Sequence, residues 1–155
     1  ILNNRKMMAR LKDRFGGHPQ VDLESDVSSE NSLHLSDIMI SDWSGAALEY
    51  AFGLERPVVF IDVPRKVLNP DYEELSCVPM EVSFRAEIGA IVPVDSLYDV
   101  PNQIERLCGD ACGQRERLRS LRKKWVYNVG RSGAVGAEYI AGAADRELSA
   151  PVAKT

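Results

Sequence analysis

A run of small and polar residues stands between two apolar segments of the chain: Ser41, Asp42, Ser44, Gly45 and Ala46. Residues 37–40 before it, which are apolar after Asp37, are too few for a buried helix and predict a strand. Residues 46–53 after it predict a helix. The first N–H groups of a helix lack intrahelical partners and carry a positive partial charge. This turn is therefore a candidate site for a diphosphate or another anion.

Each residue type at this turn has an expected role. The backbone N–H groups of Gly45, Ala46 and Ala47 are expected to face the anion, Gly45 allows its close approach, and Ser44 adds a hydroxyl donor. One turn further along the helix, the Glu49 carboxylate can accept hydrogen bonds from the hydroxyl groups of a ribose. The alternative is that Ser41 or Asp42 only caps the helix and that Glu49 is solvated.

The rest of the chain supplies elements that can position this turn. Strands are expected at residues 21–23, 37–40, 57–62 and 88–94, and helices over Met8, Leu11 and Phe15 and at residues 29–36, 46–53, 99–112, 114–129 and 132–148. Strands that are apolar on both faces are typical of a parallel sheet covered by helices. We therefore expect an α/β fold, a Rossmann-like three-layer αβα arrangement, in one domain over residues 1–149, with residues 150–155 as a disordered tail.

Residues 63–87 are rich in proline and have little periodicity, so we expect a loop with short turns, of the kind that often carries function. Glu81 and Arg85 stand four residues apart near its end. They are expected either to form an ion pair on one helix face or to line a ligand cleft.

Composition limits the function classes. A chain of 155 residues, 45% hydrophobic and 27% charged, with a net charge of −4, has the size of one domain and lacks the basic surface of a nucleic-acid binder. No apolar run reaches the length of about 18 residues that spans a bilayer. Three cysteines without a CxxC pair favour reduced thiols and a cytoplasmic location.

Other residues invite functional interpretations. His18 and His34 are expected to be surface residues, and no metal-ligand spacing is present. Cys108 and Cys112 are expected to be buried on one helix face. A basic stretch, consisting of Arg115, Arg117, Arg119, Arg122, Lys123 and Lys124, is expected to be a solvated helix face. The alternative is peripheral contact with an anionic membrane or polymer.

Three segments carry a resemblance to a known family. Residues 36–51 resemble the segment of CDP-glycerol glycerophosphotransferases, the polymerases and primases of teichoic acid synthesis, in which Ser-Asp, a short apolar strand, Thr-Asp-Tyr-Ser-Ser and a later acidic residue recur. Residues 56–62 are similar to the strand that follows in that family, and residues 127–130, with Ala134 beyond, to its closing aromatic-x-x-Gly signature. Trp43, Gly45 and Glu49 depart from the family, which usually has Tyr, Ser and Asp at these positions.

The resemblance implies a two-Rossmann-domain transferase of the GT-B kind, in which this chain is the C-terminal, donor-binding half. It implies a CDP-linked donor, no separate cofactor, and a catalytic histidine base in an upstream acceptor half, so that no catalytic residue is expected here. The chain opens in helical spacing without Met, and we expect it to be part of a longer protein, at the inner face of the cell membrane. Two alternatives are the corresponding half of a nucleotide-sugar glycosyltransferase or epimerase, and a flavodoxin-like interaction module that binds no nucleotide.

Overall fold

The computed structural model describes residues 5–24, 31–65, 72, 74 and 78–149. Contacts divide the chain into two compact units, residues 1–37 and residues 38–155, which are described separately here. The expected cap of the second helix at Ser28 or Ser29 and the expected tail at residues 150–155 lie outside the described residues.

The described residues of the first unit include the helices α1 (Arg5–Phe15) and α2 (Asn31–Leu35). Helix α1 ends as expected at a glycine, since the N–H of Gly16 donates to the Lys12 carbonyl oxygen at 2.8 Å. The strand expected at residues 21–23 is wrong: residues 21–24 are irregular, and the N–H of Val21 closes a turn onto the His18 carbonyl oxygen. Alternating polarity does not make a strand without a neighbour for its backbone.

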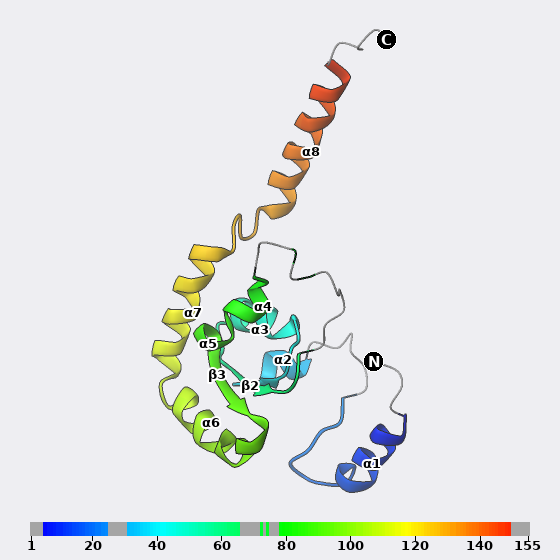
Figure 1. Ribbon diagram of the computed structural model, residues 1–155, viewed down its shortest axis with the longest axis vertical. Coiled ribbons are helices and arrows are strands. Elements are labelled where there is room, and N and C mark those ends of the chain that lie inside the picture. The colour runs from blue at the N-terminus through cyan, green and yellow to red at the C-terminus, as the bar shows by residue number, and fades with distance from the viewer. Residues whose placement is uncertain (1–4, 25–30, 66–71, 73, 75–77, 150–155) are drawn as a thin grey trace. The chain divides into compact units, whose positions relative to one another are not determined.

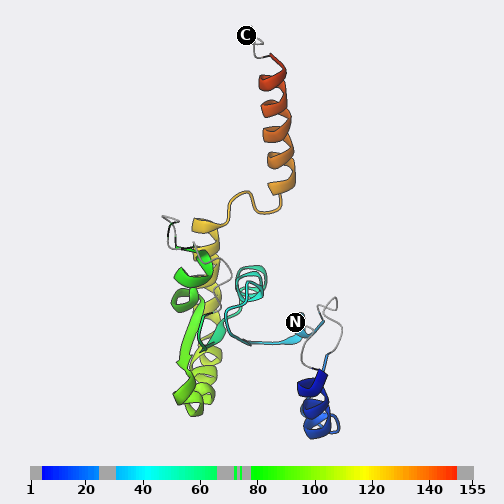
Figure 2. The same ribbon diagram turned by 45° about the vertical axis from the view of Figure 1, so that its right-hand side comes forward.

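The second unit is built on a parallel sheet of three strands, shown in Figures 1 and 2: β1 (Met39–Ser41), β2 (Val58–Asp62) and β3 (Gly89–Pro93). The strand order is β1-β2-β3, with Ile40 opposite Val59 and Val59 opposite Ala90. Helices flank this sheet, which confirms the predicted Rossmann-like α/β class. The further identification as the C-terminal half of a GT-B enzyme, and the extent of a single domain over residues 1–149, stay predictions.

The two faces of the sheet pack against different partners. On one face, Val59, Ala90 and Val92 form a buried cluster with Leu107 of helix α6 (Val100–Gly109). Because side chains alternate along a strand, Val58 and Phe60 point to the other face, where both are buried. Burial on both faces of β2 explains its continuous apolar sequence.

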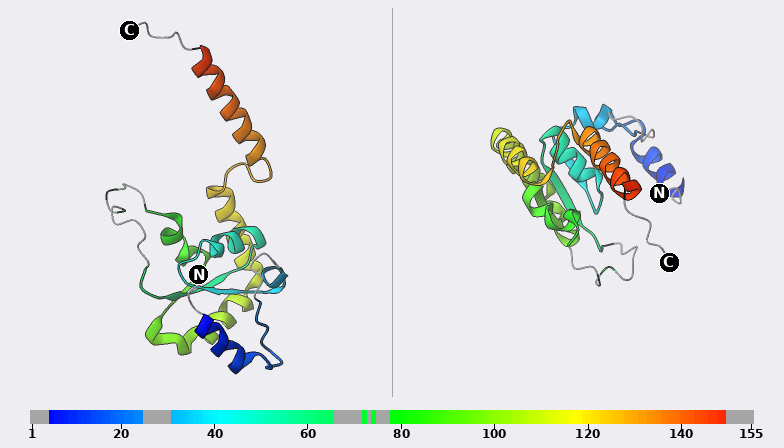
Figure 3. Two further views of the ribbon diagram at one scale, coloured as in Figure 1. Left: turned by 90° about the vertical axis from the view of Figure 1, so that its right-hand side faces the viewer. Right: turned by 90° about the horizontal axis from the view of Figure 1, so that it is seen from above.

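Aromatic side chains join the helices beyond the sheet. Phe52 of α3 (Ala46–Leu54) makes an edge-on contact with Phe84, with ring centroids 6.1 Å apart. Phe84 makes a second such contact, at 5.2 Å, with Trp125 at the end of α7 (Ala111–Trp125). Edge-to-face geometry is favourable for aromatic pairs. These contacts hold α3 beside α7, as Figure 3 shows.

The described residues of the segment 63–87 are not all in a loop. It contains two single-turn helices, α4 (Met80–Ser83) and α5 (Arg85–Ile88), on either side of the buried Phe84. Burial of Phe84 requires a defined backbone there, which the proline-rich composition did not indicate. Strand β3 starts one residue later than expected, because Ile88 closes α5.

The helix expected at residues 99–112 is divided. A 3-10 helix, η2 (Val94–Asp99), precedes α6, and the chain leaves helical geometry at Asp110 (φ −119°, ψ 50°). The Asp110 carboxylate accepts a hydrogen bond from the N–H of Gly113 at 3.1 Å and so caps α7. Cys108 and Cys112 consequently lie on different helices, and both are exposed, so their predicted burial is wrong.

The last helix, α8 (Ser132–Ser149), forms over the stretch that its weak apolar pattern predicted. Its Tyr139 and Ile140 side chains are 72% and 70% exposed. The apolar side of α8 therefore has little cover within its unit.

Candidate functional site: the turn between β1 and α3

The predicted turn lies at the carboxyl edge of the sheet. Ser41 is the last residue of β1, Asp42 and Trp43 form a bend, and α3 begins at Ala46, with Gly45 as its N-cap residue. In open parallel sheets this edge is where ligands bind. The structure thus brings the predicted phosphate-binding residues together at the start of a nine-residue helix.

Neither of the expected capping side chains caps α3. In the described chain, no side chain accepts a hydrogen bond from the first turn of this helix, so the alternative that Ser41 or Asp42 is only a cap is wrong. The N–H of Ala47 is used within the turn, since it donates to the Ser44 carbonyl oxygen at 3.1 Å. This removes Ala47 from the predicted anion donors, and the N–H groups of Gly45 and Ala46 are the remaining ones.

Neither the backbone conformation nor the packing at position 45 requires a glycine. Its dihedral angles (φ −59°, ψ −29°) suit any residue. A Cβ atom added there would meet no atom within 4 Å. The space next to Gly45 is therefore open to a ligand.

Trp43 ties this turn to the neighbouring strand. Its indole Nε1–H donates to the carbonyl oxygen of Val63, directly after β2, at 2.7 Å. The guanidinium Cζ of Arg85 lies 3.8 Å from the centroid of the Trp43 ring, and that of Arg65 lies 5.9 Å from it. Two cations thus lie against the turn, where they make it more favourable for an anion.

Arg85 is paired differently from the prediction. It is buried and its Nη1 donates to Oδ1 of Asp62 at 2.8 Å, whereas Glu81 is an exposed residue of α4. The predicted helix-face pair between Glu81 and Arg85 is wrong because the chain turns at Phe84 and buries the arginine. Because Arg85 lies next to the turn, it remains a candidate cleft residue. Glu81 has no contact with the turn in the described chain.

Glu49 lies at the edge of a cavity beside α3. This cavity of about 540 Å³ lies between α3, the end of α7 and the start of α8, and Phe52, Arg122 and Tyr127 also border it. Tyr127 belongs to the aromatic-x-x-Gly segment, so the structure brings two of the three family-like segments together. Sequence reasoning missed this cavity, because its walls come from residues about 75 positions apart, whose proximity no local pattern signals.

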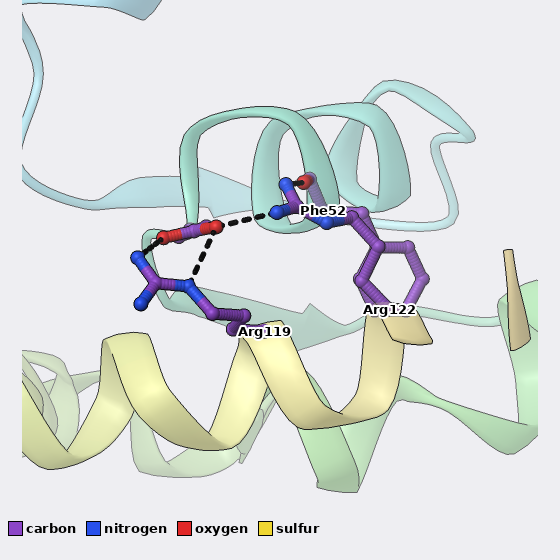
Figure 4. Close-up of polar contacts among 4 residues, drawn as sticks. Phe52, Arg119 and Arg122 are labelled. Carbon is purple, nitrogen blue, oxygen red and sulfur yellow. Dashed lines mark hydrogen bonds and ion pairs between the residues drawn. The ribbon is translucent and has the colours of Figure 1, made fainter. Parts of the chain in front are cut away.

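The basic stretch on α7 is partly used inside the molecule, as Figure 4 shows. Arg119 donates to both carboxylate oxygens of Glu55, and Arg122 donates to Glu55 at 2.6 Å and to the Phe52 carbonyl oxygen at 2.6 Å. The Nη2 of Arg117 lies 3.3 Å from the Ala86 carbonyl oxygen. These three arginines bind other elements of the protein, and Arg122 is half-buried by its contacts. The other members of the stretch are exposed, as predicted: Arg115, Arg117, Arg119, Lys123 and Lys124.

The histidines lie in the first unit. His18 is exposed, and its Nδ1 accepts a hydrogen bond from the N–H of Gln20; His34 lies on α2. In the residues that the structure describes, no group of three or more His, Cys, Asp or Glu side chains is placed to hold a metal ion. Among the same residues, no helix combines the length and apolar character needed to cross a membrane.

Comparisons of the chain with protein families, curated proteins and solved structures find no match. The resemblance to CDP-glycerol glycerophosphotransferases therefore stays a prediction from the residues that carry it.

Proposed function

We propose that this chain binds the diphosphate of a nucleotide-linked donor, most directly CDP-glycerol, as the donor-binding half of a glycerophosphotransferase that builds a cell-envelope polymer. The observation that supports the proposal is the turn at residues 41–46. It joins the carboxyl end of a buried parallel strand to the start of α3, without a side-chain cap.

The turn offers suitable chemistry for a diphosphate. The N–H groups of Gly45 and Ala46 and the helix dipole favour negative charge, and the space beside Gly45 admits a phosphate oxygen. Ser44 supplies a hydroxyl donor. The backbone N–H groups are fixed by the fold, so they need no reorganisation of their own when a phosphate binds.

The nucleoside is assigned to the cavity beside α3. Glu49, one turn from Gly45, provides a carboxylate for the ribose hydroxyls, and Tyr127 provides an aromatic face for the base. A donor held in this way would have its diphosphate at the helix start and its nucleoside along the helix.

Transfer also needs a base to deprotonate the acceptor hydroxyl and in-line positioning of the two oxygens. Residues 38–155 contain no histidine. We assign the base to another part of the enzyme, at the inner face of the cell membrane. The chain by itself is then expected to bind the donor without releasing CMP from it.

A ligand panel tests the proposal. A ligand that binds only the folded chain raises its stability by RT ln(1 + [L]/Kd), so CDP and CDP-glycerol are expected to raise the melting temperature. Stronger stabilisation by UDP or GDP compounds would favour a nucleotide-sugar enzyme instead. A chain that responds to no nucleotide would fit an interaction module and contradict the proposal.

Substitutions in the turn locate the site. Ser44→Ala removes one donor, which is worth about 0.5–1.5 kcal/mol, and Gly45→Val fills the open space, so calorimetry should show weaker nucleotide binding for both. Ser120→Ala and Gly109→Val are matched controls: Ser120 is exposed on α7, and Gly109 also has open space around a Cβ atom. Unchanged affinity in Gly45→Val, with the melting temperature preserved, would remove the turn from the site.

A further inference from the structure

Arg85 is buried with most of its hydrogen-bonding capacity unused. Its side chain is 5% exposed, and only Nη1 is paired, with Oδ1 of Asp62. In the described structure, Nε and Nη2 are buried and have no hydrogen-bond partner. Buried N–H groups without partners are costly, and native proteins keep few of them unless they serve another purpose.

The two unused nitrogen atoms form one edge of the guanidinium group. The N–H bonds of Nε and Nη2 run side by side and match the two oxygens of a phosphate or a carboxylate. The Asp62 carboxylate is bound at Nη1, outside this edge, and its side chain is 46% exposed at the end of β2. The ion pair therefore orients the guanidinium group without occupying its bidentate edge.

The Arg85 guanidinium group lies against the turn of the proposed diphosphate site. The Arg85 guanidinium packs against Trp43 within the turn at residues 41–46, and its Cζ lies 5.1 Å from the centroid of the Phe60 ring. Asp62 is the last residue of β2, and Trp43 comes two residues after Ser41, the last residue of β1, so both lie at the carboxyl edge of the sheet. A buried cation with two unpaired donors thus lies against Trp43, in the turn that leads into α3.

We propose that the Nε and Nη2 edge of Arg85 binds one phosphoryl group of the donor diphosphate, while the start of α3 binds the other. This inference rests on the proposed function and adds Arg85 as a second binding group for the diphosphate. Both nitrogen atoms are shielded in the structure, so a neighbouring side chain must move when the anion arrives. Trp43, which covers the guanidinium group, is the side chain that we expect to move.

Nuclear magnetic resonance of the ¹⁵N-labelled chain tests the inference directly. Titration with inorganic pyrophosphate, and separately with CDP, is expected to shift the Arg85 Nε–Hε resonance and to slow its exchange with water. Arg85→Lys assigns the resonance and keeps the charge but loses the bidentate edge, so it should weaken pyrophosphate binding at least tenfold. Arg115→Lys, a substitution of an exposed residue on α7, is the matched control and should leave affinity unchanged.

Tryptophan fluorescence gives a second readout. In a Trp125→Phe background, Trp43 is the only tryptophan, and its emission should change when pyrophosphate binds. If Arg85→Lys does not fold, the Trp43 emission of the Trp125→Phe chain still tests the inference, and an emission that pyrophosphate leaves unchanged would contradict it.

The results separate the inference from the proposed function. Pyrophosphate binding that leaves the Arg85 resonance and the Arg85→Lys affinity unchanged would overturn the inference and leave the proposed function standing. An equal response to acetate at the same concentration would overturn the diphosphate assignment. A wild-type chain that binds neither pyrophosphate nor CDP would contradict both.

Discussion

Arg119 binds Glu55 through two hydrogen bonds, from Nε to Oε1 at 3.2 Å and from Nη2 to Oε2 at 2.7 Å. Glu55 ends α3 in the left-handed conformation (φ 55°, ψ 42°), which is uncommon for a residue other than glycine. The pair links the end of α3 to α7. The hydrogen bond from Arg119, followed by the charges of Arg119 and Arg122, lowers the pKa of Glu55.

This pKa predicts how stability depends on pH. A carboxyl group whose pKa is lowered by folding stabilises the folded chain above its unfolded pKa of about 4.3, and this contribution is lost as the pH falls through the lowered value. Glu55→Gln should cost at most about 1.5 kcal/mol at pH 7, because Arg119 is half exposed and water screens the pair. Its loss of melting temperature on acidification should be smaller than that of the wild type. Glu105→Gln, an exposed control on α6, should follow the wild-type profile.

Gly89 should be intolerant of any side chain. A Cβ atom there would overlap the carbonyl oxygen of Val58 on the neighbouring strand. Gly89→Ala must therefore push β3 away from β2, at a cost of about 1–3 kcal/mol or more, measurable by urea unfolding. Gly109→Ala has open space around the added methyl group and should be neutral or stabilising. Equal stability of the two variants would contradict the packing described for β3.

The Asp110 cap should set the start of α7. Asp110→Ala removes the acceptor of the Gly113 N–H and should cost about 0.5–2 kcal/mol, whereas Asp110→Asn should retain most of the stability. Thermal unfolding of the two variants beside the wild type measures this difference. A loss that is equal in Asn and Ala would mean that the carboxylate charge, not the cap, is responsible.

Helix α8 should exchange its amide hydrogens faster than the sheet. Its Tyr139 and Ile140 side chains are largely exposed, whereas Val59 of β2 is fully buried. Segments with few buried contacts open at low free energy, so hydrogen exchange followed by mass spectrometry should find weak protection in α8. Protection equal to that of β2 would show that α8 is covered by something that its own unit does not supply.

Local pattern predicted the fold well where each element is defined by its own residues. Strand β2 could be predicted because its apolar residues follow one another without interruption. Helix α3 could be predicted because a mostly apolar segment, in which Glu49 is the charged residue, follows the turn directly. Local pattern was not sufficient at residues 21–23, because a strand forms only where a neighbouring strand can pair with its backbone. The division at Asp110 had a local signal, an Asp followed three residues later by the N–H that it caps, and longer helical periodicity obscured it.

The candidate site likewise combines features that the local sequence predicts with features that depend on distant residues. The turn at residues 41–46 could be predicted because strand, small residues and helix follow directly in the chain. The burial of Arg85 and its pairing with Asp62, 23 residues away, could not be predicted, since they depend on how α5 packs against the end of β2. The cavity beside Glu49 depends in the same way on the distant end of α7.

The narrow sheet has a practical consequence for handling the protein. In the part of the chain that the structure describes, β1 and β3 each pair only with β2, so each strand has one side whose backbone groups are not joined to a further strand. Rows of unpaired N–H and C=O groups are templates on which another chain can add a strand. Ile40 and Ile91 are exposed on these outer strands and favour such association. We therefore expect that association of folded chains at high concentration, more than thermal unfolding, limits how long a preparation of this chain stays monodisperse.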